Sequence, residues 1–394
     1  MKRFCWLIFS IFIISGCAAT RHATPENLLN NVNVFGIQDV RAVGGIPSDS
    51  FKKDFIKLLE QEEKANFSFL DFKKIRTYSV LAISGGAANG AYGAGLLNGW
   101  SHSGARPVFK VVTGVSTGAI IAPFAFLGTD YDGKLKEFYT KYSTRDVARM
   151  HLSNNAFTST WPLVQLIEKY FDEGLLKKIA VEYNNGRRLY VGTTNLDAQR
   201  LIIWDMGKIA SIGDANSLKL FRKVILASVS IPMAFPPVYF NVEFQDKMYD
   251  EMHVDGGVVR QVFFLSDVIR GGDRAIKERG MDVSNIHYKI YIIRNGYADA
   301  IWQEVPDKLS AIAGRSMDTM INAQSIGDMY QVYTFTQLGR GDFNLAYIPA
   351  TYVSKAKQLF DPVEMRRLFD LGFEEAAQGY NWKKTPPGLE EVGK

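Results

Sequence analysis

Apolar and polar positions follow two different periods along the chain, and their alternation predicts an α/β fold. From residue 78 onward, short apolar runs typical of buried strands are separated by stretches in which apolar residues recur every three or four positions, as on helices. Strands that alternate with helices in this way form a largely parallel sheet, with one antiparallel hairpin expected at 188–204. The expected strands span 78–84, 109–113, 188–194, 201–204, 288–294 and 343–348, and the expected helices span 91–101, 118–127, 134–142, 217–228, 308–338 and 362–378.

The residues before this alternating region have a different pattern. Residues 18–48 are rich in Asn, Gly, Pro and small polar residues without a clear period, which predicts a tether. Residues 49–66 carry apolar side chains at helical spacing, and the mixed sign of the intervening charges favours packing on the main domain over lying on a membrane. The expected organisation is a leader at 1–16, a tether and helix at 17–75, one domain at 76–380 and a polar tail at 381–394.

The first residues of the chain are typical of a secretory signal. Two basic residues precede the apolar stretch Phe4–Ile14, which is too short to span a hydrocarbon core of roughly 30 Å. The small residues before Cys17 resemble the lipobox of bacterial lipoproteins, which implies cleavage after residue 16 and lipidation of Cys17. Ala18 implies an outer-membrane address if the host has two membranes. The alternative is an ordinary cleaved signal in which Cys17 is incidental.

Composition and charge narrow the possible functions. The chain has 394 residues, of which 47% are hydrophobic, and this is enough for a large core. Its formal net charge is only +5, and it has neither a long Lys/Arg run nor paired C-x-x-C motifs, so neither nucleic-acid binding nor structural zinc is expected. Without the leader, Cys17 is the only cysteine, so no internal disulfide is expected.

One serine lies in a sharp turn between an expected strand and an expected helix. Gly114 and Gly118 flank Ser116 in the pattern G-x-S-x-G. The glycines permit a cramped backbone that exposes the serine oxygen, and the helix N-terminus directs partial positive charge toward it. This favours a nucleophilic serine that acts on an acyl group, while the alternative is a tight turn with an incidental serine.

A loop of small residues, Ser84–Gly90, precedes this turn between another strand and helix. Small side chains at Gly85, Gly86 and Ala87 leave backbone N–H groups uncovered, which suits either a phosphate or the oxyanion of an acyl-transfer intermediate. The glycine spacing does not match the nucleotide-binding motifs. The alternative is a seam of small residues where the helix packs on the sheet.

A nucleophilic serine needs a base. His287 is the one histidine that follows Asp255, in the order that α/β-hydrolases require, but its place at the start of a strand is typical of a structural residue. Asp255 itself follows a short expected strand and precedes Gly256 and Gly257, and partial burial would raise its basicity. Taken alone, this pattern is equally typical of an aspartate with only a structural role in a turn.

In their order and intervals these motifs, together with the segment Ala-Ser-Val-Ser-Ile-Pro at 227–232, resemble the patatin-like phospholipases. The resemblance implies a three-layer α/β/α fold with a mostly parallel sheet and hydrolysis of acyl esters of lipids. It implies a Ser/Asp dyad without histidine, with Ser116 as the nucleophile and Asp255 as the base, and it implies no metal or cofactor. Gly85, Gly86 and Ala87 would form the oxyanion hole.

One loop departs from the family pattern, which usually reads Gly-Gly-Gly-x-Arg-Gly. This chain has Ala87 at the third glycine and Asn89 at the arginine. If position 87 needs a positive φ, alanine costs on the order of 1 kcal/mol there. Without the arginine the loop would stabilise a negative charge less well, so the departure implies a slow enzyme.

The expected function is a lipid acyl ester hydrolase of the phospholipase or lysophospholipase type, anchored to a bacterial cell envelope. Its expected partners are the lipid substrate and the membrane, with no nucleic acid and no metal. Two alternatives stay open: a Ser-Asp-His esterase that uses His287, and a catalytically weak or inactive lipid-binding envelope lipoprotein, which Ala87 and Asn89 favour.

Overall fold

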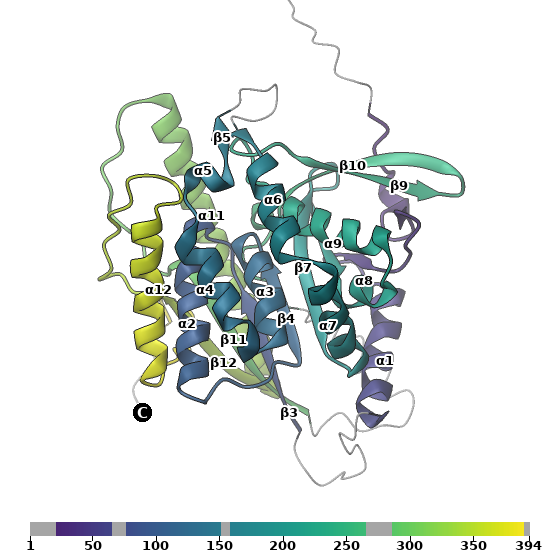
Figure 1. Cartoon of the computed structure of the whole chain (residues 1–394), viewed down its shortest axis with the longest axis horizontal. Coiled ribbons are helices and arrows are strands. Elements are labelled where there is room, and N and C mark those ends of the chain that lie inside the picture. Colours follow the sequence, from purple (N-terminus) through teal and green to yellow (C-terminus); the bar gives the residue numbers. More distant parts are fainter. Residues whose placement is uncertain (1–20, 65–75, 151–157, 265–285, 390–394) are drawn as a thin grey trace, which may run out of the picture.

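A ten-stranded sheet forms the centre of the computed structural model, which describes residues 21–64, 76–150, 158–264 and 286–389. The middle of the sheet consists of parallel strands in the order β7, β4, β3, β11 and β12 (Figure 1). Buried on both faces, such strands are nearly continuous apolar runs, which is why the sequence predicts them well. They span, in that order, Arg188–Asn195, Val111–Val115, Arg76–Ile83, Ile286–Tyr297 and Gly341–Ile348.

Antiparallel strands extend the sheet beyond β7. The expected hairpin is present, since β7 pairs with β8 (Arg200–Asp205). Another hairpin, β9 (Val238–Phe244) and β10 (Lys247–Asp255), pairs with the last residues of β7 through β10, where the sequence predicts only a short strand. Two short strands near the N-terminus complete the sheet: β1 (Asn33–Val34) pairs with β9, and β2 (Arg41–Val43) pairs with β8.

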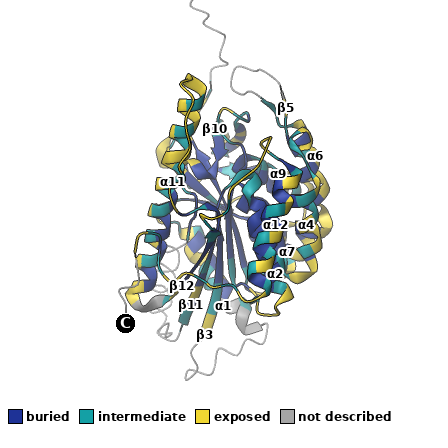
Figure 2. Ribbon diagram, turned by 90° about the vertical axis from the view of Figure 1, so that its left-hand side faces the viewer, coloured by how far each residue is buried: buried dark blue, intermediate teal, exposed yellow. Residues whose placement is uncertain are grey.

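Helices cover both faces of this sheet, so the fold is the expected three-layer α/β/α sandwich (Figure 2). On one face, apolar residues of α1 and α11 pack against β3, β11 and β12. The opposite face is covered by a larger set of helices, with α2 and α12 packed closely together. The helices are α1 (Asp49–Lys64), α2 (Gly90–His102), α3 (Thr117–Leu127), α4 (Asp132–Lys141), α5 (Thr144–Val147), α6 (Trp161–Tyr170), α7 (Glu173–Asn184), α8 (Met206–Ile212), α9 (Ala215–Ser228), α11 (Leu309–Phe335) and α12 (Pro362–Ala377).

The N-terminal stretch differs from the expected tether, because residues 21–48 are part of the fold. Leu29, Val34 and Val40 are buried, and β2 adds a strand to the sheet. Inside this stretch Arg41 forms a buried ion pair with Glu251, with 2.6 Å between Nη1 and Oε2. This packing could not be predicted from the local sequence, because apolar residues are sparse in this stretch. In addition, the residues that it packs against lie far along the chain. Residues 1–20, including the leader and Cys17, lie outside the described part.

Two further segments bear on the expected organisation. α1 packs on the domain through buried Phe51 and Leu58, rather than lying on a membrane. The expected polar tail is partly structured, because Lys383 exchanges backbone hydrogen bonds with Leu345 and the Trp382 ring lies 4.8 Å from that of Trp100. No helix in the described part of the chain is both long and apolar enough to cross a membrane.

Candidate active site

Ser116 lies in a strained turn between β4 and α3. Its backbone has φ 54° and ψ −126°, a conformation that costs a residue with a side chain roughly 1–2 kcal/mol. The two flanking glycines are required by space, since a Cβ on Gly114 would collide with the Gly118 carbonyl and one on Gly118 with the Ile83 carbonyl. The turn therefore holds the serine at the carboxyl edge of the sheet, as the G-x-S-x-G pattern predicts.

The ends of β4 and β10 meet on the same edge of β7, and this brings Ser116 close to Asp255. Val115 at the end of β4 pairs with Gly192, and Asp255 at the end of the oppositely directed β10 pairs with the next residue, Thr193. Ser228 fills the junction. Its hydroxyl donates to the Gly192 carbonyl at 2.7 Å and accepts the Ser116 N–H at 3.0 Å.

The carboxyl of Asp255 is buried and faces the serine hydroxyl. Gly257 donates its N–H to Oδ1 at 2.7 Å, while Oδ2 has no well-aligned hydrogen-bond partner among the described residues. Burial raises the pKa of Asp255 to about 7, against the opposing effects of the Ser116 hydroxyl and the Gly257 N–H. The Ser116 hydroxyl is close enough to Asp255 to lower its pKa, although no well-aligned hydrogen bond joins the two side chains.

The raised pKa of Asp255 predicts how the stability of the folded protein depends on pH. The folded protein holds this proton more tightly than the unfolded chain, whose Asp pKa is about 3.9, so stability is expected to fall as the pH rises from about 4 to about 7. Asp255→Asn removes this ionisation and is expected to be more stable than wild type at pH 8 by up to roughly 4 kcal/mol. Urea unfolding at pH 4 and pH 8 measures the effect, and an equal stability difference at both pH values would contradict it.

The glycine loop before α2 lies beside the serine, and Asn295 holds it in place. A Cβ on Gly85 would stand 3.1 Å from the Ser116 Cβ. Asn295, at the end of the apolar part of β11, donates its N–H to Ser84 Oγ at 2.8 Å and its side-chain amide to the Ser84 carbonyl at 2.9 Å. Its side-chain oxygen accepts the Gly93 N–H at 3.1 Å. The small residues of this loop therefore pack closely on the sheet, as the alternative interpretation predicts. The same loop is also arranged in a way that suits an oxyanion.

The three expected oxyanion donors are not equivalent. Gly85 already donates its N–H to the Gln261 carbonyl at 3.4 Å, so this donor is partly engaged. Within the described chain, neither Gly86 nor Ala87 donates to a loop or turn carbonyl. Gly86 has φ 152° and a Cβ there would collide with Asn295, which explains the requirement for glycine.

Ala87 has φ 47°, so the position does favour glycine. Ala87→Gly is expected to raise the free energy of unfolding by about 0.5–1 kcal/mol, because relief of the left-handed strain exceeds the entropy gained by the unfolded chain. Urea titration measures this change. The matched control is Ala88→Gly one residue later, where φ is not positive and the same substitution is expected to destabilise. Equal effects at both positions would refute the assignment of strain to residue 87.

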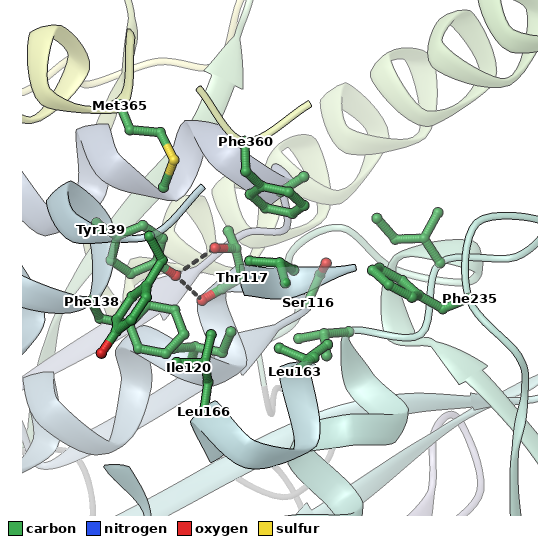
Figure 3. Close-up of a pocket in the computed structure, with 15 residues that line it drawn as sticks. Ser116, Thr117, Ile120, Phe138, Tyr139, Leu163, Leu166, Phe235, Phe360 and Met365 are labelled. Atoms are coloured by element: carbon green, nitrogen blue, oxygen red, sulfur yellow. Dashed lines mark hydrogen bonds between the residues drawn. The ribbon is translucent and has the colours of Figure 1, made fainter. Parts of the chain in front are cut away.

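An apolar pocket of about 550 Å³, including its open mouth, begins at Ser116 (Figure 3). The Tyr139 hydroxyl contacts Thr117 Oγ1 at 2.5 Å and donates to the Thr117 carbonyl at 3.0 Å, which closes one wall. The size and lining suit an aliphatic chain better than a polar ligand. The lining residues include Ile120, Phe138, Val147, Leu163, Leu166, Ile231, Phe235, Phe360 and Met365.

His287, the candidate histidine, does not lie where it could act on Ser116, and neither does His253, which precedes Asp255 on β10. His287 pairs with Thr77 near the start of the parallel strands, six residues before Ile293, which is level with the serine turn, so it lies roughly 20 Å away. Its Nε2 instead lies 3.2 Å from the Asp342 carboxylate. His253 is buried, and its two ring nitrogens contact Thr193 and Glu251. The Ser-Asp-His alternative is therefore wrong for this structure.

Several residues of this site escape sequence reasoning. Ser228 lies in the Ala-Ser-Val-Ser-Ile-Pro segment, but its bridging role depends on a strand junction that only the fold creates. A polar residue directly after a buried strand, as at Asn295, is the signal that could have identified the loop's support. Among the described residues, no group of His, Cys, Asp or Glu is arranged to hold a metal ion.

Comparisons with known proteins gave a family match and a structural match. A family model described as patatin-like phospholipase matches residues 81–266, a range that contains the glycine loop, Ser116 and Asp255. The chain is also similar to a solved structure, the crystal structure of VipD from Legionella pneumophila, with 10% sequence identity and a TM-score of 0.38. That alignment covers 80% of this chain and 72% of the other. No curated protein matches the sequence.

Proposed function

Since residues 81–266 match the patatin-like phospholipase family model, we propose that this chain hydrolyses acyl esters of lipids with Ser116 as the nucleophile and Asp255 as the only protein base. The family suggests lipid acyl hydrolase activity in general. The observation that carries the specific assignment is the buried Asp255 carboxyl, whose pKa is about 7, facing a strained serine at the head of an apolar pocket.

In the proposed reaction Asp255 accepts the proton of Ser116 as its Oγ attacks the acyl carbonyl carbon. The backbone N–H groups of Gly86 and Ala87, with weaker help from Gly85, stabilise the negative oxygen of the tetrahedral intermediate. When the ester C–O bond breaks, Asp255 returns the proton to the leaving alcohol. Asp255 then takes a proton from the water that attacks the acyl-serine carbonyl, and it returns this proton to Ser116 Oγ as the acyl-serine C–O bond breaks. The products are a free fatty acid and the regenerated serine.

We also propose that Cys17 carries the lipid anchor that the leader suggests, in the envelope of a bacterium and at the outer membrane if there are two membranes. Several acyl chains on one residue, at about 0.8 kcal/mol per buried methylene, would hold the protein beside insoluble substrate. Metabolic labelling with a fatty-acid analogue tests this, because labelling that persists in Cys17→Ala would contradict it.

Reaction with a fluorophosphonate probe, followed by incubation with defined phospholipids and lysophospholipids, tests the activity. We expect covalent labelling of Ser116 and release of free fatty acid. Purified, folded protein that neither reacts with the probe nor releases fatty acid would contradict the proposal, and it would favour the inactive lipid-binding lipoprotein.

His287→Ala is expected to leave hydrolysis of a short-chain chromogenic ester within about twofold of wild type, because a single partly exposed contact with Asp342 is worth little and the residue is remote from Ser116. Steady-state kinetics on the purified variant measure this. Loss of activity without loss of folded protein would revive a histidine-dependent mechanism.

A further inference from the structure

Large apolar side chains are exposed at the carboxyl edge of the parallel sheet, the edge where Ser116 lies. They come from separate segments that follow β10, β11 and β12, so the topology brings them to one end of the molecule. Trp302 and Leu309 are 87% and 86% exposed, and Val353 is 69% exposed. We call this set the apolar rim, and it consists of Val258, Trp302, Leu309, Ile312, Val353 and Leu359.

The first half of α11 projects from the domain and carries part of the rim. No residue between Leu309 and Met320 is buried, and the first buried residue of the helix is Ser325 (Figure 2). The projecting turns contain only two charged residues, Arg315 and Asp318. Within the described chain nothing covers the side chains of Leu309, Ile312 and Met320 on these turns, and their exposure indicates contact with something outside the described chain.

The second half of α11 holds the loop that follows Asp255. Asp328 is buried and accepts backbone N–H groups from Gln261 at 2.7 Å and Val262 at 3.2 Å. Arg260 adds an ion pair with the same carboxylate at 2.7 Å. The projecting half of the helix is therefore rigidly connected to the segment that carries the catalytic aspartate.

The N-terminus of the described chain lies at the same edge. Arg21 pairs with Asp197, in the turn beyond the carboxyl end of β7, at 2.7 Å and with Asp250 at 2.6 Å. Arg21 follows Cys17 by four positions along the chain, a reach of at most about 14 Å. A lipid at Cys17 would thus hold this edge, and not the opposite one, against a membrane.

We propose that the apolar rim docks on a lipid surface and brings the mouth of the Ser116 pocket to the substrate. This rests on the proposed function, because the occupant is the lipid that the pocket takes. Charges around the rim balance, with four acidic and four basic residues in 298–320 and 350–360, so apolar insertion rather than attraction to anionic head groups drives the contact. We therefore expect the apolar rim to bind a neutral lipid surface without any anionic lipid.

The test uses the chain from residue 17 onward with Cys17→Ser, which keeps every described element but cannot be lipidated. The rim variant is Trp302→Ser, Leu309→Ser and Ile312→Ser together. The matched control is Val108→Ser, Val181→Ser and Leu338→Ser, which are similarly exposed and precede β4, β7 and β12 at the opposite edge. Flotation with neutral phosphatidylcholine vesicles is expected to show partitioning at least about tenfold weaker for the rim variant and unchanged for the control.

Two further measurements separate this proposal from the proposed activity. Trp302 fluorescence is expected to shift to shorter wavelength when vesicles are added, and Trp302→Phe is expected to lose that shift. Hydrolysis of a soluble short-chain ester is expected to be equal in all three proteins, while fatty-acid release from vesicles falls with binding. Vesicle binding through the rim by a protein that is inactive on every ester would refute the proposed activity and leave docking standing.

Three results would overturn the docking proposal. The first is equal vesicle binding by the rim variant and the parent protein. The second is binding only to anionic vesicles that high salt abolishes. The third is a parent protein that ignores vesicles but forms a dimer that the rim variant dissociates, because a second copy of the chain would then be the occupant.

Discussion

Asp255→Asn is expected to lower kcat/KM for a short-chain ester by about 10³–10⁴-fold. Asparagine has nearly the same shape, and its oxygen can still accept the Gly257 N–H that now contacts Oδ1 at 2.7 Å, so the loop is expected to persist. The amide cannot take the proton of Ser116. Because the two residues act as one unit in the proposed mechanism, Ser116→Ala and the double variant are expected to show losses similar to that of Asp255→Asn.

The pH dependence of wild type gives the same prediction a second measurement. The pKa of Asp255 is about 7, and only the ionised carboxylate can act as a base, so kcat/KM is expected to fall about tenfold per pH unit below that value. Asp205→Asn is the matched control. Burial also raises the pKa of Asp205 to about 7, but its hydrogen-bonding contact is the Lys208 N–H and not a candidate nucleophile. Activity that survives in Asp255→Asn but not in Asp205→Asn would refute the assignment.

The proposed catalytic pair was accessible to sequence reasoning because its signals are local. A strained turn needs Gly114 and Gly118 within two residues of Ser116, and these glycines are visible without any knowledge of the fold. The parallel strands are similarly visible, since burial on both faces produces unbroken apolar runs. The motifs at Ser116 and Asp255 indicate candidates, but their proximity depends on β4 and β10 meeting at β7 from opposite directions.

Long-range pairing explains what the sequence could not predict. The stretch 21–48 looks like a tether because its few apolar residues have no period, yet β1 and β2 pair with strands about 160–210 residues further along the chain. Arg41 shows the same limit, because its partner Glu251 is 210 residues away. The engagement of the Gly85 N–H by Gln261 is likewise invisible before the loop after Asp255 is placed.

Arg188→Met is expected to lower the free energy of unfolding by about 3–5 kcal/mol, the largest loss of stability we predict. Arg188 is 1% exposed at the start of β7, and its guanidinium contacts the Asp54 carboxylate at 2.5 Å and the Gln61 side chain at 3.0 Å. It thereby fastens α1 to the sheet. Its removal would leave the carboxylate of Asp54 buried without a counter-charge, and the pKa of Asp205 would rise further, because Arg188 now opposes the burial that raises it.

Urea unfolding at pH 7 measures this loss, and two further variants identify its cause. Lys141→Met removes an exposed ion pair, with Glu137 at 3.0 Å, and is expected to cost less than about 0.5 kcal/mol. The double variant Asp54→Leu and Arg188→Met is expected to recover part of the loss, because no unpaired charge remains at that site. A double variant as unstable as the sum of its single changes would mean that lost packing, and not the stranded carboxylate, dominates the cost of removing Arg188.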